Sequence, residues 1–287
     1  MKNIKEKIFE LIIKLITLIS ILLLVFIVLF IFKESFDFFK EVSIFKFISG
    51  KSWNPLGEPN KLSILPTILG TIYVSLVAII IALPIGIGSS IALSSYASEK
   101  GKTIIKSSLD ILVGIPSVVY GFIGLLVLIK FLENKLSLSS GESALAGGIL
   151  LSIMILPYII STCTESMNKI NEKYSQNSNA LGVSKSYMMR KILLPQSKIS
   201  ILAGTILALS RAMGETMAVM MVIGNAPITP KLLGKCQTIP SLIALEMGMA
   251  GVGSLHYHAL FASGFVLMIM LLIINMVFYL IRKNIDI

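Results

Sequence analysis

The polar residues best placed to do chemistry are Arg211 and Glu215, which stand inside the apolar stretch 199–223. Their spacing of four residues puts them on one face of a helix, where guanidinium and carboxylate can pair. An Arg at bilayer depth costs about 2.5–3.5 kcal/mol even on the lenient insertion scale, so it faces the bundle interior or a water-filled path. Because a guanidinium stays charged and offers oxyanions a planar fork of donors, we interpret Arg211 as a group that meets an anion in transit. Glu215 would hold the guanidinium in position and, while no anion is bound, partly neutralise its charge.

Other interpretations of this pair remain open from the residues alone. The pair can be a buried ion pair that only locks helix packing, although Ser210 and Thr216 add hydroxyls beside it and Gly214 permits close helix approach. Glu215 can also be the acid or base of a membrane-embedded enzyme, which needs a second titratable group at similar depth. Asp110 is the only candidate for that group, and it is more typical of a helix start. A scaffold without a transport role leaves an Arg in mid-membrane unexplained.

The composition indicates that lipid, rather than water, surrounds most of the chain. It is 55% hydrophobic and 14% charged, with a mean hydropathy of +0.88, whereas a soluble domain carries about 25% charged residues. Apolar runs of roughly 20 residues are long enough to cross a bilayer. The sequence therefore predicts an all-α polytopic membrane protein with six transmembrane helices, at Leu11–Phe32, Ile64–Leu93, Leu109–Phe131, Ala144–Thr162, Ile199–Ile223 and Leu260–Ile281.

Two of these spans carry further signals. The first follows several lysines, as in a signal peptide, but it is longer than a typical signal sequence and no small-residue cleavage site follows, so we interpret it as a retained span. The third contains Gly114 and Pro116, which predict a bend.

The net charge of +10 fits basic cytoplasmic loops better than nucleic-acid binding, and the distribution of Lys and Arg predicts that both termini are cytoplasmic. The inverted topology is the alternative.

The loop 163–198 is then the longest cytoplasmic connection, and it is basic. It reads as a short helix, a turn at Gly182, a second helix and a stop at Pro195. The second helix has one apolar face, formed by Val183, Tyr187, Met188, Ile192 and Leu193. Such a face either docks onto another protein or packs beneath its own bundle, and periodicity does not decide between the two.

The remaining features suggest structural roles. Trp53 is typical of an aromatic anchor at the membrane surface, and 239–250 is expected to form a short helix at the outer face. Cys163 and Cys236 fall in separate loops, so neither a disulfide nor a metal site is expected. His256 and His258 lack further ligands, which favours helix-end or surface roles over metal binding.

The chain also contains two imperfect matches to a nucleotide-binding loop. In Gly50-Lys51-Ser52 and Gly101-Lys102-Thr103 the first glycine of the P-loop is missing, and neither follows a strand of a soluble α/β unit. We therefore expect this chain to bind no nucleotide and no other cofactor itself.

Several motifs resemble those of a known family. Gly182, nine residues and then Ile192-Leu193-Leu194-Pro195 resemble the cytoplasmic coupling loop of ABC importer permeases, although Gln176-Asn177-Ser178 replaces its usual Glu-Ala-Ala start. The stretches 65–71, 114–121, 211–219 and 224–225 are similar to phosphate-specific permeases. The continuation Glu215-Thr216-Met217-Ala218-Val219 looks like the PstC type, whereas the sister PstA type usually continues Glu-Thr-Ala-Pro.

This resemblance implies a permease subunit with the MetI-like fold of ABC importers, in a bacterial plasma membrane. Its implied partners are a PstA-like permease, two PstB-like ATPase subunits that use ATP, and an external phosphate-binding protein. Residues 1–63 would form an N-terminal helix and outer loop, and 64–287 the permease domain. The implied substrate pathway contains Ser210, Arg211, Glu215 and Thr216, and the implied ATPase coupling residues are Gln176, Ala180, Leu181, Gly182, Ile192, Leu194 and Pro195. Because Arg211 alone does not distinguish oxyanions, a molybdate or sulfate permease is the alternative.

Overall fold

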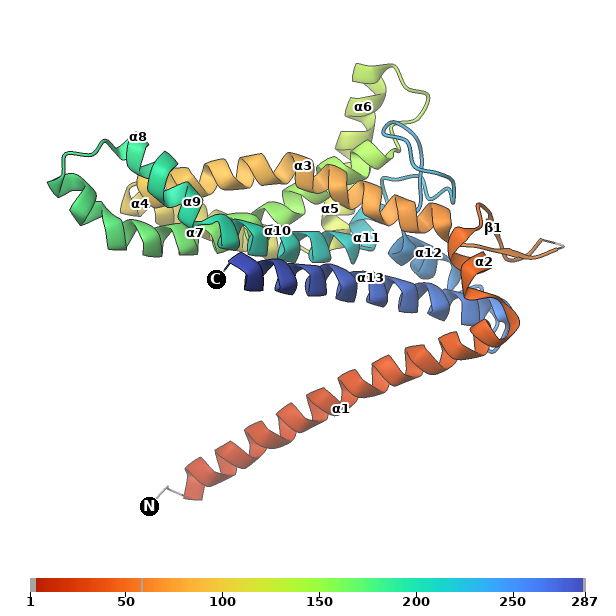
Figure 1. The fold of residues 1–287 in the computed structure, drawn as a ribbon. Coiled ribbons are helices and arrows are strands. Elements are labelled where there is room, and N and C mark those ends of the chain that lie inside the picture. Colours follow the sequence, from red (N-terminus) through yellow and green to blue (C-terminus); the bar gives the residue numbers. More distant parts are fainter. Residues whose placement is uncertain (1–3, 58, 286–287) are drawn as a thin grey trace.

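The structure is a computed structural model that describes residues 4–57 and 59–285. It is an elongated bundle of helices with one small β-hairpin (Figure 1). The elements are α1 (Ile4–Glu41), α2 (Ile44–Ser49), β1 (Trp53–Asn54), β2 (Lys61–Leu62), α3 (Leu65–Ser95), α4 (Glu99–Gly114), α5 (Ser117–Ile123), the π-helix η1 (Gly124–Leu128), α6 (Ile129–Leu136), α7 (Ala144–Ala180), α8 (Lys185–Met188), the π-helix η2 (Met189–Leu193), α9 (Leu194–Gln196), α10 (Lys198–Met213), α11 (Met217–Met220), α12 (Ile239–Glu246) and α13 (Leu255–Ile285).

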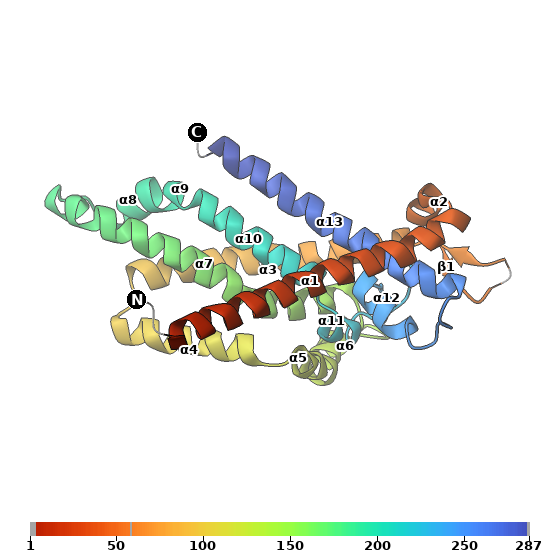
Figure 2. The same ribbon diagram turned by 90° about the horizontal axis from the view of Figure 1, so that it is seen from below.

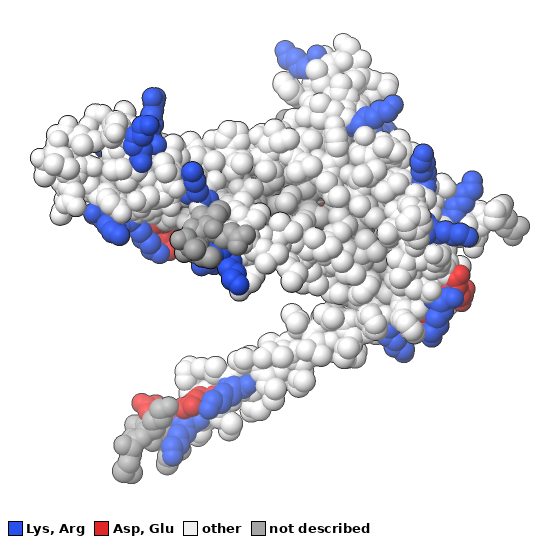
Figure 3. Space-filling model, in the orientation of Figure 1, with Lys and Arg blue, Asp and Glu red and all other residues white. Residues whose placement is uncertain are grey.

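The lengths and polarity of these helices confirm a polytopic membrane protein. Among the described residues, five helical segments are long and apolar enough to cross a bilayer, and a sixth is reached if the segment 185–196 and α10, which meet at a bend of 61°, count as one span. On the face seen in Figure 3, Lys and Arg lie mainly at the two ends of the bundle and on the projecting α6, and the surface of the bundle between its ends is almost uncharged. An apolar band of this kind is what the hydrocarbon layer requires.

The core of the bundle lies where α3, α7 and α10 run side by side, with α13 on one flank and α4 on the other (Figure 2). Leu151, Ile155 and Ile159 of α7 are almost completely buried there. Small residues bring the helices close, because a Cβ on Gly148 would overlap the Val77 side chain of α3. Ser90 Oγ also donates a hydrogen bond to the Ile160 carbonyl oxygen at 3.2 Å, which ties α3 to α7.

Helix α1 diverges from this core over most of its length (Figure 1). None of the side chains in its most apolar window is buried. Its far end rests on α13 through edge-on ring contacts between Phe30 and Phe261 and between Phe32 and Phe265, with centroids 5.4 and 5.8 Å apart. Between about Ile21 and Phe32 the free part of α1 therefore presents an apolar surface to lipid or to another membrane protein.

The residues after α1 form a second, smaller core with α12 and α13, and Trp53 belongs to it. The expectation of a surface anchor at Trp53 is wrong, because the side chain is only 7% exposed and its Nε1 donates to both carboxylate oxygens of Glu246, at 3.0 and 2.9 Å. His256 lies 2.7 Å from the same carboxylate, and His258 lies 3.0 Å from Glu34 of α1. The histidines, which lie in the first turn of α13, thus pair with carboxylates of α12 and α1, and α12 confirms the predicted short helix.

The predicted third span is divided more sharply than a bend. Helix α4 ends at Gly114 and α5 begins at Ser117, because Pro116 cannot continue the hydrogen-bond ladder. The Tyr120 hydroxyl donates to the Leu112 carbonyl oxygen at 2.9 Å and so satisfies a group that the break releases. Only Ser117–Leu136 has the length and polarity of a crossing helix, and no residue of α4 is buried, so the predicted start at Leu109 is wrong.

The cysteines are free, but one of them does not lie in a loop as expected. Cys163 is buried inside α7, since this helix continues to Ala180 instead of ending near Thr162. Cys236 lies in the connection between α11 and α12, where burial raises the pKa of its thiol to about 12. A thiol that stays protonated is a poor nucleophile, so Cys236 acts as a small apolar side chain.

Helix α3 offers a matched test of the packing between the core and the outer connections. A Cβ at Gly70 would overlap the backbone oxygen of Gln237, whereas nothing lies within 4 Å of a Cβ at Gly88 in the same helix. We expect Gly70→Ala to destabilise the protein by about 1–3 kcal/mol through overpacking and Gly88→Ala to leave it unchanged or slightly more stable. Thermal unfolding of the purified protein in detergent measures both, and equal midpoints for the two variants would contradict this packing.

Candidate functional site

The helix that carries Arg211 is broken next to the predicted ion pair of Arg211 and Glu215. Helix α10 ends at Met213 and α11 begins at Met217, so the prediction of one continuous helix to Ile223 is wrong. Gly214 is a weak helix former, and the Glu215 carboxylate accepts a hydrogen bond from the Ala218 amide at 3.5 Å, in the first turn of α11. This side chain thereby competes with the helical ladder and starts a second short helix.

The predicted ion pair is present and spans this break. Arg211 Nη1 lies 2.8 Å from Glu215 Oε2, and the two side chains differ sharply in exposure, at 43% for Arg211 and 4% for Glu215. Arg211 stands about 20 Å along the helix axis from Lys198, at roughly 1.5 Å per residue, which is well inside a hydrocarbon layer of about 30 Å. The buried carboxylate therefore holds a guanidinium that still presents part of its fork outside the protein core.

One residue that sequence reasoning did not place at the site lies beside Arg211, and a second holds the end of α11. The Tyr158 side chain of α7 is within interaction range of the Arg211 guanidinium. Asn225 adopts a left-handed conformation with φ of 45° and donates through Nδ2 to the Met220 carbonyl oxygen at 2.7 Å, capping α11. A tyrosine within the apolar fourth span was a signal for the first residue, but nothing local indicated its pairing with α10.

The two predicted hydroxyl groups, of Ser210 and Thr216, lie close to the break in sequence. Thr216 Oγ1 donates to the Gly214 carbonyl oxygen at 3.3 Å, inside the unwound segment. Ser210 Oγ and Asn225 Oδ1 are buried and have no hydrogen-bond partner among the described residues. Unsatisfied buried polar atoms are rare in proteins and often mark functional positions. The site thus offers one exposed guanidinium edge and unused polar atoms around a buried carboxylate.

The connection between α11 and α12 holds the end of α11 in place. Cys236 donates its amide to the Ile223 carbonyl oxygen at 3.0 Å, and Ser143 donates to Val222 at 3.1 Å. Lys235 Nζ lies 2.6 Å from Glu142 Oε2 and ties the same connection to the start of α7. These contacts hold α11 against α7, so the position of Glu215 is set from both ends of the break.

At the opposite end of the bundle, the predicted coupling residues form one hairpin. Helix α7 runs to Ala180, the chain reverses at Gly182 with φ of 66°, and α8, η2 and α9 return to Gln196. Pro195 does not stop the helix as expected, because the π-turn before it already shifts the hydrogen bonding, with Leu194 donating to Met189. The helix breaks two residues later, at Ser197. We call residues 176–196 the coupling hairpin.

Some apolar side chains of this hairpin are buried, and others are exposed. Leu193 is 1% exposed and packs into the core of the bundle, whereas Leu181 and Tyr187 are 80% and 56% exposed. The predicted coupling residues divide in the same way, with Ile192 and Leu194 half-buried and Gln176, Ala180, Leu181, Gly182 and Pro195 exposed. The inner face of the hairpin thus packs beneath its own bundle, and its tip is free to contact another protein.

Comparison with known proteins agrees with this geometry. The family model for the binding-protein-dependent transport system inner membrane component matches residues 82–286. The chain is 38% identical to the probable ABC transporter permease protein YqgH of Bacillus subtilis, with 80% of this chain and 74% of that protein covered. It is 35% identical to the phosphate transport system permease protein PstC of Mesorhizobium japonicum, covering 80% and 76%. An inward-facing structure of the MetNI methionine ABC transporter superposes with a TM-score of 0.59 at 16% identity, covering 77% of this chain and 95% of that one.

The chain therefore belongs to the family of binding-protein-dependent transport system inner membrane components. It is a transport subunit rather than an enzyme, and its fold is that of ABC importer permeases of the MetI type. This assignment removes the alternatives of a membrane-embedded enzyme and of a scaffold without a transport role.

The geometry of the break predicts a local effect of the Glu215 charge. In Glu215→Gln the Ala218 amide keeps an acceptor but loses a charged one, which weakens the hydrogen bond by about 1 kcal/mol. Hydrogen exchange in Met217–Met220 should become about fivefold faster. Ser210→Ala is the matched control, since its Oγ makes no hydrogen bond. Equal exchange rates in the two variants would mean that the carboxylate does not organise α11.

Proposed function

We propose that this chain is the permease subunit of an ATP-driven importer that moves inorganic phosphate across the plasma membrane. The observation that carries the proposal is the ion pair at the helix break, with a partly exposed guanidinium at bilayer depth. The relatives named as phosphate permeases support phosphate as the anion. An Arg that only locked packing would have a covered side chain, and that of Arg211 is 43% exposed.

The unequal burial of the pair suggests how the anion is bound and released. A phosphate oxygen approaching the exposed part of Arg211 meets a guanidinium with five N–H donors, of which the contact with Glu215 Oε2 involves Nη1. The same carboxylate repels the incoming anion and neutralises the guanidinium once the anion leaves. Phosphate is then held by charge-assisted hydrogen bonds whose strength is limited by a fixed negative neighbour.

Energy would come from a separate ATPase that contacts the tip of the coupling hairpin. The exposed Leu181 and Tyr187 support such a contact, and so does the direct continuation of the hairpin into α10. An ATPase at this tip places the hairpin and both termini in the cytoplasm, and the loops around α12 then face outward. The full importer would contain two PstB-like ATPase subunits and an external phosphate-binding protein.

A PstA-like permease would form the second half of the membrane domain. The uncovered apolar surface of α1 supports this arrangement, since a helix with no buried side chain in its apolar window has room for another subunit. A permease for molybdate or sulfate remains the second candidate function, because the guanidinium fork accepts any tetrahedral oxyanion. Uptake of labelled phosphate in the presence of excess sulfate or molybdate distinguishes them.

The Arg211 proposal predicts a selective loss of transport. We expect Arg211→Ala to leave the complex assembled but to reduce phosphate uptake about 10- to 100-fold, the value of a lost charge-assisted hydrogen bond. Arg211→Lys should recover only part of the uptake, because an ammonium lacks the planar fork. Lys198→Ala, which removes a charge from the start of the same helix, is the control. Normal uptake by Arg211→Ala would reduce the ion pair to a packing device.

The turn of the coupling hairpin predicts an uncoupled variant. A left-handed residue other than glycine costs about 1–2 kcal/mol, so Gly182→Ala should distort the tip at φ of 66°. We expect the complex to hydrolyse ATP while the phosphate moved per ATP falls several-fold. Gly182→Asn tolerates this conformation and should restore coupling. If Gly182→Ala transports with unchanged stoichiometry, the hairpin is not the coupling element.

A further inference from the structure

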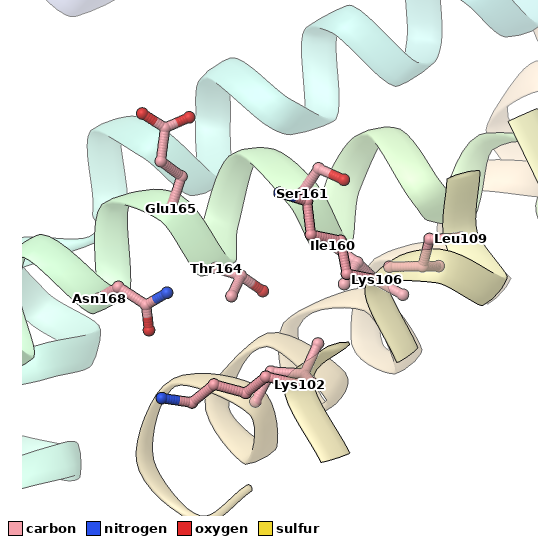
Figure 4. Close-up of a pocket in the computed structure, with 9 residues that line it drawn as sticks. Lys102, Lys106, Leu109, Ile160, Ser161, Thr164, Glu165 and Asn168 are labelled. Carbon is pink, nitrogen blue, oxygen red and sulfur yellow. The ribbon is translucent and has the colours of Figure 1, made fainter. Parts of the chain in front are cut away.

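A cleft of about 370 Å³ separates α4 from the second half of α7, near the end of α3 (Figure 4). It lies at the same end of the bundle as the coupling hairpin, since Asn171 of α7 donates to the Ser94 carbonyl oxygen of α3 at 2.9 Å. Its walls mix aliphatic and polar side chains, namely Leu93, Lys102, Lys106, Leu109, Ile160, Ser161, Thr164, Glu165 and Asn168. None of the residues that line the cleft belongs to the proposed substrate pathway, so that pathway does not explain it.

The polar groups of the cleft are arranged asymmetrically. Thr164 and Asn168 lie on the side of α7 that faces Lys102 of α4, whereas the Glu165 side chain, which also lines the cleft, extends from the other side of α7 (Figure 4). Glu165 is also neutralised there, because Lys169 Nζ lies 2.8 Å from its Oε1. The side of the cleft that faces α4 therefore combines cations with neutral hydrogen-bonding groups, a combination suited to an anion.

Its cations are available to a ligand. Lys106 forms no ion pair with any side chain that the structure describes. Lys102 pairs with Glu99 at 2.7 Å, but the Glu99 side chain is 88% exposed, and such surface pairs contribute little to stability. Thr164 Oγ1 is buried in the wall and has no hydrogen-bond partner among the described residues.

Helix α4 itself has the character of an interfacial helix. Ser98 caps its start, and none of its residues is buried against the bundle. Ile104 and Ile111 are 66% and 67% exposed, so the helix offers aliphatic side chains as well as its lysines to the surroundings. Amphipathic helices with lysines on the polar face lie at the boundary of headgroups and acyl chains.

We infer that this cleft binds the phosphate group of an anionic phospholipid from the cytoplasmic leaflet. The headgroup phosphate would lie between Lys102 and Lys106, and an acyl chain would follow the aliphatic wall. Free phosphate has the same oxyanion chemistry, but it gains nothing from Leu93, Leu109 and Ile160, which make most of the cleft apolar. Basic pockets between membrane helices on the cytoplasmic side are typical sites for anionic headgroups. The inference rests on the proposed orientation, and it does not depend on phosphate conduction at Arg211.

Lipid binding to the assembled transporter, purified in detergent, tests this inference. Native mass spectrometry counts the lipids retained after addition of phosphatidylglycerol or, separately, of phosphatidylcholine. We expect phosphatidylglycerol to bind and Lys102→Gln/Lys106→Gln to weaken it by about fivefold for each lysine. Lys100→Gln, on the same helix but outside the cleft, is the matched control and should bind normally. Lys102→Arg/Lys106→Arg keeps both charges and should also bind, which separates lost charge from misfolding.

A second arm of the experiment distinguishes the two sources of phosphate. Labelled inorganic phosphate is added to the same samples, and we expect no displacement of phosphatidylglycerol. Displacement, together with a loss of phosphate binding in Lys102→Gln/Lys106→Gln, would overturn the lipid assignment in favour of free phosphate. Equal lipid binding by that variant and Lys100→Gln would overturn the site itself. Phosphate uptake by the wild type is measured in parallel, so a failed lipid site is not confused with a failed transport function.

Discussion

A charged pair and an unwound backbone at bilayer depth form the constraint on which this structure depends. In hydrocarbon every backbone polar group needs a partner within the protein, so irregular chain is tolerated only where it is buried or lines a water-filled cavity. Glu215 meets both demands, because it is 4% exposed, accepts from the Ala218 amide and pairs with Arg211 across the break. Helices α5 and α7 pack against α11, which begins two residues after this carboxylate.

The same helix that presents Arg211 also connects it to the coupling hairpin. The segment 185–196 joins α10 through a bend of 61° at Ser197, and α10 then runs without interruption to Met213. We propose that a movement of the hairpin is passed along α10 to the guanidinium, with the buried residues Leu193 and Ser197 at the bend. This is a physical route for coupling, since a single helix links the two proposed sites.

The sequence predicted the parts of this arrangement that depend on composition and local spacing. Six apolar stretches, the pairing of Arg211 with Glu215 and the turn at Gly182 each follow from periodicity or residue type. The break after Met213 could not be predicted in this way, because apolarity continues through Met217–Met220 and only a tertiary environment makes the Glu215 carboxylate a better partner than the helical ladder. The role of Tyr158 was not predicted, and that of Trp53 was predicted wrongly, for a similar reason. Their partners, Arg211 and Glu246, are distant from them in sequence.

The central claim is that the positive edge of Arg211 is presented to a solute rather than enclosed. Electron microscopy of the assembled transporter, trapped with phosphate between outward and inward states, tests it most directly. The account predicts a cavity that reaches the guanidinium and tetrahedral density within about 3 Å of its nitrogen atoms, the distance of a hydrogen bond. A guanidinium walled in by neighbouring side chains in every state, with no cavity reaching it, would contradict the account.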